Sequence, residues 1–141
     1  MATRSIIAKL DDKGVQAIYC HNDGYLSNNG KILDLYYTDN TDEQDAKDKV
    51  NELLAGGDIS SLKDTIEDTI FYMRDRGESN KEATTLKDES ALLEFAFELC
   101  DAEVVYMFAY GSWYVYDNSN AIGNSSYQFI ELEEALYNVL A

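Results

Sequence analysis

His21 and Asp23 stand two residues apart in "YCHNDGY", the segment that holds the only histidine of the chain. An imidazole near a carboxylate can act as a general base, so the pair is a candidate for proton transfer or ligand binding. The pair also lies where a strand pattern runs into an Asp-Gly turn, and residues two apart at a strand end need not face each other. The residues alone leave both roles open.

Arg74 and Arg76 in "RDRGES" form the densest positive cluster of an acidic chain. Guanidinium groups bind phosphates and carboxylates through paired N–H donors. The same two arginines can instead pair with the surplus acids. If the two loops meet in space, His21, Asp23, Arg74 and Arg76 would suit a nucleotide-like phosphate, in a binding protein or in an enzyme.

Ligands for a metal and known catalytic motifs are missing from the sequence. Cys20 and Cys100 lie far apart outside any CxxC pair, and we expect both to be reduced and buried. The chain has no GxSxG, P-loop, HExxH or GxGxxG motif. We therefore expect no metal and no cofactor, we assign no catalytic residue, and we favour a protein that is not an enzyme.

Charge is the strongest compositional signal. The chain has 11 Lys and Arg against 27 Asp and Glu, for a net charge of −16. No base follows Lys87, so the ten acids from Asp88 onward carry −10 of that charge. Such a surface repels nucleic acid and anionic membranes, and it can instead imitate nucleic acid toward a basic protein. The plainer alternative is that the charge serves solubility. No long apolar run or secretory signal appears, so we expect a cytoplasmic protein.

Aromatic residues accompany these acids. Eleven tyrosines exceed what a small core usually needs, and tyrosine and tryptophan are favoured at protein interfaces. Aromatic cross-strand pairs within a sheet would explain them equally well. The predicted partner-binding residues are Asp88, Glu89, Glu94, Glu98, Asp101, Glu103, Tyr106, Tyr110, Trp113, Tyr114 and Asp117.

Hydrophobic periodicity predicts one α+β domain over residues 1–141, with a mainly antiparallel sheet, two hairpins and about four helices. The expected order is β-β-α-α-β-α-β-β-α. Residues 69–74 are ambiguous, but their β-branched and aromatic side chains favour a strand. In the helix over 88–100, Leu92, Leu93, Phe95, Ala96 and Leu99 should face the core. The other expected elements are a hairpin over 4–20, helices over 31–37, 41–55 and 128–141, and two strands within 103–117.

Several segments together resemble a family of small phage and prophage proteins of unknown function. They are "TRSIIA", "YCHNDGYLSNNGKIL", "GDISSL", "FYMRDRGES" and "VVYMFAYGSWYVYD". The resemblance carries no established activity; it implies a phage accessory protein in the host cytoplasm, and its Arg-Asp-Arg-Gly block supports a strand over 69–74. The stretch after "GDISSL" is shorter here than the family pattern leads us to expect.

Three functions follow from these observations. The leading one is a non-enzymatic inhibitor of a basic host protein, such as a nuclease of a restriction or CRISPR defence, that acts through a DNA-mimicking acidic surface. The first alternative is a small-molecule protein or enzyme with a His/Asp/Arg phosphate site. The second alternative is a homo-oligomeric accessory protein, such as a homodimer, that packs through its tyrosine-rich hairpin.

Overall fold

The computed structural model describes residues 3–38, 43–118 and 128–140 as a mixed sheet covered by helices. Strands β1 (Ser5–Asp11) and β2 (Gly14–Cys20) form the expected first hairpin, with Ala8 opposite Ala17. Strands β6 (Val104–Ala109) and β7 (Ser112–Asp117) form the expected second hairpin. The prediction of a single-domain α+β fold with two hairpins is confirmed.

The sheet order is β4-β3-β2-β1-β6-β7-β8, and β5 also pairs with β2. The added strands are β3 (Ile59–Ser61), β4 (Ile70–Phe71), β5 (Thr84–Leu86) and β8 (Ile130–Glu131). Two pairings, β1 with β6 and β2 with β3, are parallel. The other described pairings are antiparallel, which agrees with the expected character of the sheet.

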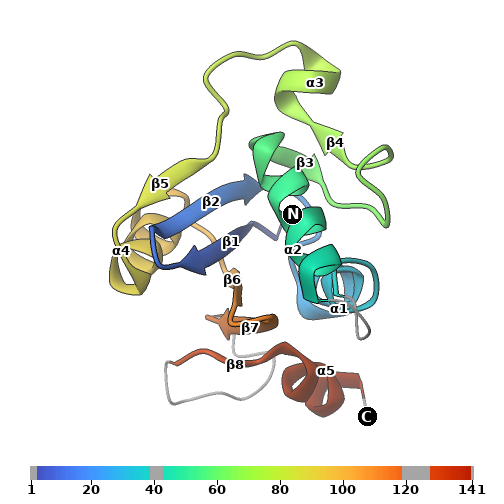
Figure 1. Cartoon of the computed structure of the whole chain (residues 1–141), viewed down its shortest axis with the longest axis vertical. Coiled ribbons are helices and arrows are strands. Elements are labelled where there is room, and N and C mark those ends of the chain that lie inside the picture. The colour runs from blue at the N-terminus through green and yellow to red at the C-terminus, as the bar shows by residue number, and fades with distance from the viewer. Residues whose placement is uncertain (1–2, 39–42, 119–127, 141) are drawn as a thin grey trace.

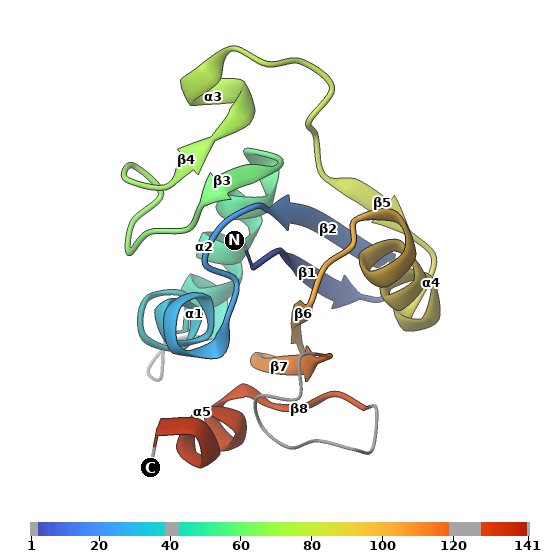
Figure 2. The same ribbon diagram turned by 180° about the vertical axis from the view of Figure 1, so that it is seen from behind.

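Helices cover both faces of the central strands (Figures 1 and 2). Helices α1 (Lys31–Tyr36), α2 (Glu43–Ala55) and α5 (Leu132–Leu140) pack on the face that contains Ile7 and Ile18. Helix α4 (Glu89–Glu94) and the π-helical segment η2 (Phe95–Leu99) pack on the opposite face, which contains Ile6 and Ala8. Strand β6 is buried along its whole length because both of its faces are covered.

The strand predicted over 69–74 is wrong beyond Phe71, because helix α3 (Tyr72–Arg76) follows it directly. The Asp75 carboxylate accepts a hydrogen bond of 2.7 Å from the Phe71 N–H and so satisfies a donor at the start of this helix. Gly77, with φ of 66°, ends the helix, and its N–H donates to the Met73 carbonyl. Capping overrides the strand propensity of the aromatic run.

Three short strands, helix α3 and the π-helical segment η1 (Leu26–Gly30), which falls in a stretch whose Asp-Gly and Asn-Asn-Gly indicate a loop, were also missing from the expected order. Strands β3, β5 and β8 have two or three residues each, too few for an alternating pattern to be recognised. Helices α1, α2, α4 and α5 lie within their expected ranges. The expected start of the second helix at residue 41 lies outside the described residues.

The helix expected over 88–100 changes to π geometry at Phe95, where the Cys100 N–H donates to the Phe95 carbonyl at 3.0 Å. A π turn is wider than an α turn, so each residue advances less around the axis. Leu92 and Ala96 still face the core, but Leu99 is rotated away and is 77% exposed. The expectation that Leu99 faces the core is therefore wrong.

We expect Gly57→Ala to destabilise the protein more than Gly77→Ala. Both glycines have left-handed φ, +81° and +66°, which costs an alanine about 1–2 kcal/mol. A Cβ at Gly77 meets nothing within 4 Å, whereas one at Gly57 would overlap the Lys81 carbonyl oxygen and approach the Met73 Cε to 2.6 Å. Urea unfolding measures both losses, and equal losses would contradict this account of Gly57.

Candidate functional site

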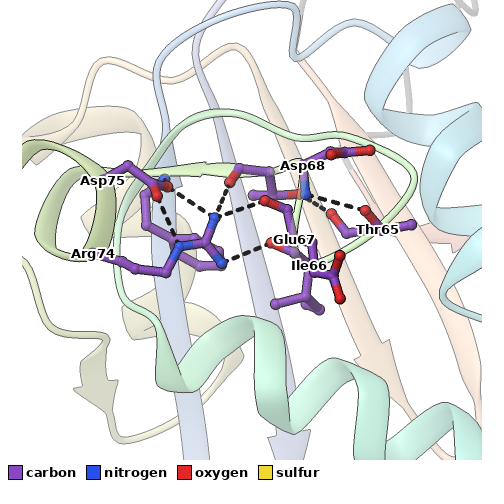
Figure 3. A network of polar contacts seen from close by, with 8 residues as sticks. Thr65, Ile66, Glu67, Asp68, Arg74 and Asp75 are labelled. Atoms are coloured by element: carbon purple, nitrogen blue, oxygen red, sulfur yellow. Dashed lines mark hydrogen bonds and ion pairs between the residues drawn. The ribbon is translucent and has the colours of Figure 1, made fainter.

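Arg74 serves the fold and not a ligand. Its guanidinium donates to both oxygens of Asp75 at 2.9 Å and to the carbonyls of Ile66 at 2.9 Å, Glu67 at 3.0 Å and Thr69 at 2.7 Å (Figure 3). It also lies 4.6 Å from the centre of the Phe71 ring. Arg74 thus joins the loop before β4 to helix α3 through five hydrogen bonds that involve all three of its guanidinium nitrogens.

Asp23 serves a turn. It is exposed, it has a left-handed φ of 56°, and its carbonyl accepts a hydrogen bond of 3.1 Å from the Asn28 side chain. Among the described residues, no polar contact joins its carboxylate to His21 or to either arginine. The structure therefore does not assemble the predicted four-residue site.

His21 directly follows β2, at the end of the sheet where β2 pairs with the parallel strand β3. Its backbone N–H donates to the Ile59 carbonyl at 3.1 Å, and its ring Nδ1 lies 2.7 Å from the Tyr19 hydroxyl. The Asn22 side chain donates to the Ser60 carbonyl and hydroxyl at 3.0 and 3.2 Å. Arg76 reaches the same Ser60 hydroxyl at 3.4 Å. His21 and Arg76 therefore share one end of the sheet.

Asp58 holds three segments together at this end. Its N–H donates to the Lys81 carbonyl at 2.7 Å, and its carbonyl accepts from the Tyr72 N–H at 3.2 Å. Its carboxylate accepts from the Tyr19 N–H at 2.9 Å. Burial raises the pKa of Asp58, and the hydrogen bond from Tyr19 and the charge of Lys81 oppose that rise.

Basic side chains gather around this junction. Arg4 contacts Asp101 at 3.3 Å and also interacts with Tyr19. Arg76 and Lys81 lie 5.3 and 5.9 Å from the centre of the Tyr72 ring. We call Arg4, Arg76 and Lys81 the cationic cluster. Sequence reasoning missed Arg4, Asp58 and Lys81; the first two stood in the quoted segments "TRSIIA" and "GDISSL", but neither carried a chemical signal of its own.

Neither cysteine is poised as a nucleophile. Cys20 is buried, and the Asn29 side chain donates to its Sγ at 3.3 Å. Burial, with a contribution from the charge of Asp58, raises the pKa of Cys100 to about 11. Both thiols are free, as expected, although Cys100 is only half-buried.

The predicted acidic residues lie mainly around α4 and η2. Asp88 caps α4, where its carboxylate accepts from the Ala91 N–H at 2.9 Å. Glu89, Glu94 and Glu98 are exposed, and none of the described residues forms an ion pair with them. Asp101 pairs with Arg4, and Glu103 is half-buried. We call Asp88, Glu89, Glu94 and Glu98, with the exposed Leu99 beside them, the acidic face.

Three predicted partner-binding residues are buried and need correction. Tyr106 is fully buried, and its hydroxyl donates to the Gly24 carbonyl at 2.6 Å. Trp113 is 5% exposed and donates to the Tyr37 carbonyl at 3.2 Å. Asp117 is 3% exposed. Because both faces of the β6–β7 hairpin are covered, most of its aromatic side chains lie in the core. Of the predicted aromatic residues, only Tyr110, which is 87% exposed, and the half-buried Tyr114 are accessible to a partner.

No protein-family model, curated protein or solved structure matches this chain. Within residues 3–38, 43–118 and 128–140, no group of three His, Cys, Asp or Glu is placed to hold a metal ion. No helix in the same ranges is long and apolar enough to cross a membrane. The resemblance to phage proteins therefore stays a prediction.

We expect Arg74→Gln to lower the urea midpoint of unfolding and Arg76→Gln to leave it nearly unchanged. The first substitution releases three loop carbonyls and Asp75, whereas the second removes one hydrogen bond of 3.4 Å and the contact with the Tyr72 ring. The two variants lose the same charge from the same helix, so each controls for the other. A larger loss with Arg76→Gln would contradict the division of roles.

Alkylation of Cys100 should accelerate with pH up to about 11, because only the thiolate reacts and the pKa of this thiol is about 11. An ordinary thiol levels off near its reference pKa of 9.0. Iodoacetamide labelling resolved by peptide mass spectrometry measures the rate, with circular dichroism confirming the fold at each pH. A plateau near pH 9 would show that Cys100 is not held in its neutral form.

Proposed function

We propose that this protein is a non-enzymatic inhibitor that binds a basic, nucleic-acid-binding protein of the host cell through the acidic face. The observation that carries the proposal is the exposure of Glu89, Glu94 and Glu98 with no ion-pair partner among the described residues. These residues belong to a chain whose net charge is −16. Carboxylates arranged on a helix can occupy the basic groove in which a partner would otherwise hold phosphates.

These carboxylates on α4 and η2 add little to the stability of the fold. Glu94 and Glu98 lie about one helical turn apart, and like charges at that spacing cost a few tenths of a kcal/mol. Leu99 exposes an apolar side chain at the end of the same segment. Because a π-helical segment is rare and frequently occurs at functional sites, its presence here supports a binding role. An apolar anchor with charged neighbours is the usual composition of a protein interface.

The resemblance to phage proteins supports the identity of the partner class. A phage accessory protein with this surface would act in the host cytoplasm on a nuclease or another nucleic-acid-binding protein, including those of restriction or CRISPR defence. Direct binding of DNA or RNA by the acidic face is not expected, because carboxylates and phosphates repel each other.

The test begins with an affinity pull-down from a bacterial host lysate, followed by competition between this protein and DNA for the captured partner. Glu94→Gln/Glu98→Gln should weaken binding roughly five- to tenfold, since two exposed charge contacts are worth about 0.5 kcal/mol or more each. The slope of affinity against salt concentration should also fall. The matched control is Glu133→Gln/Glu134→Gln, which removes two exposed charges from α5.

The control variant should bind as the unmodified protein does. Equal losses in both variants would show that only the total charge matters and that the acidic face is not the site. Capture of a partner whose DNA binding is unaffected by this protein would contradict the inhibitory mechanism.

A further inference from the structure

The cationic cluster draws together three segments that are far apart in the chain. Arg4 precedes β1, Arg76 ends α3, and Lys81 lies in the connector between α3 and β5 (Figure 1). Asp58 fixes two of these segments to β2 through hydrogen bonds of 2.7, 3.2 and 2.9 Å to Lys81, Tyr72 and Tyr19. The fold therefore fixes the backbone positions of Tyr72 and Lys81 relative to Tyr19, the residue with which Arg4 interacts.

Arg76 has donors to spare. A guanidinium carries five N–H donors, and within the described part of the chain Arg76 makes one hydrogen bond, of 3.4 Å, to Ser60. Its neighbour Arg74 shows the contrast, because its contacts to Asp75 and three carbonyls involve all three of its guanidinium nitrogens. The Arg76 guanidinium also lies 5.3 Å from the centre of the Tyr72 ring, and this cation–π contact does not use the N–H donors in the guanidinium plane.

The ion pair between Arg4 and Asp101 is weak. The Arg4–Asp101 pair spans 3.3 Å, and the Asp101 side chain is 89% exposed, so water screens the attraction. A ligand with two negative charges can displace such a carboxylate. The second acid at the junction, Asp58, is half-buried and already accepts from the Tyr19 N–H.

Tyr19 and His21 add two polar side chains to this end of the sheet. Burial raises the pKa of Tyr19, against the charge and hydrogen bond of Arg4, so its hydroxyl stays protonated at neutral pH. This hydroxyl lies 2.7 Å from His21 Nδ1, so the two side chains are hydrogen-bonded to each other. The His21 imidazole and the Tyr19 hydroxyl thus lie at the same end of the sheet as the three cations.

We propose that the cationic cluster of Arg4, Arg76 and Lys81, with His21, binds a phosphate dianion, either inorganic phosphate or the phosphate group of a small ester. Two guanidinium forks and one ammonium match the oxygens of phosphate, and Lys81 contributes as a point charge. The net charge of −16 opposes the binding of any anion, so the attraction of the local cations has to outweigh that repulsion. The proposal does not depend on the proposed function, because the acidic face contributes none of these residues.

The experiment is a titration of the full chain, isotope-labelled, with inorganic phosphate and separately with adenosine monophosphate, followed by NMR at pH 7.5. Sodium chloride at matched ionic strength is the reference. We expect saturable shifts at His21, Tyr72 and the Arg76 side chain with phosphate and not with chloride. Tighter binding of the nucleotide would identify an ester as the ligand, and equal affinity would identify the phosphate group alone.

Arg4→Gln, Arg76→Gln and Lys81→Gln should each weaken phosphate binding roughly fivefold, the effect of losing about 1 kcal/mol from one ionic contact. Lys13→Gln is the matched control, because Lys13 is exposed in the β1–β2 turn at the opposite end of the hairpin. It should leave the dissociation constant unchanged. Arg76→Lys, which keeps the charge but loses the fork, should lie between Arg76→Gln and the unmodified protein.

Three results would overturn the proposal. The first is the absence of saturable shifts at tens of millimolar phosphate. The second is the same shifts with chloride, which would reveal an ionic-strength effect. The third is a loss as large in Lys13→Gln as in the cluster variants. The amide spectrum of each variant reports its fold, and a variant that unfolds is replaced by the other two.

Discussion

Asp58 makes the contacts on which the end of the sheet around the cationic cluster depends. One residue satisfies the N–H groups of Tyr19 and Tyr72 and donates to the Lys81 carbonyl, so it joins β2, α3 and the connector to β5. Gly57 beside it has a left-handed φ and leaves no room for a Cβ against the Lys81 carbonyl. Without this junction, neither Arg76 nor Lys81 would have a fixed position relative to Tyr19 and His21.

Opposite charges meet where η2 ends. Leu99 closes the acidic face, Asp101 pairs with Arg4 two residues later, and Arg4 belongs to the cationic cluster. A phosphate that displaced Asp101 would free one more carboxylate next to the acidic face. The two proposed sites are therefore neighbours, but they use different residues and can be tested separately.

Periodicity in the sequence was sufficient where side chains alternate over six or seven residues, as in β1, β2, β6 and β7. It failed at Phe71, where hydrogen bonds of Asp75 and Gly77 start and end a helix inside an aromatic run that favours strands. It failed again at Leu99, because a change from α to π geometry has no signature in residue spacing.

The candidate site was predictable only in part. Glu89, Glu94 and Glu98 are exposed as their positions on an amphipathic helix indicate. Tyr106 and Trp113 were assigned to a surface because the sequence does not reveal that helices cover both faces of the second hairpin. Arg74 and Arg76 look alike in sequence, and only the structure shows that Arg74 donates hydrogen bonds to three loop carbonyls. Such differences arise from contacts between segments far apart in the chain.

The most direct test of the central claim is hydrogen exchange of this protein alone and in complex with its captured basic partner. If the acidic face is the binding surface, the new protection will concentrate in amides of α4 and η2, from Glu89 to Leu99. Protection confined to the β6–β7 turn around Tyr110, with α4 and η2 unchanged, would contradict binding through the acidic face.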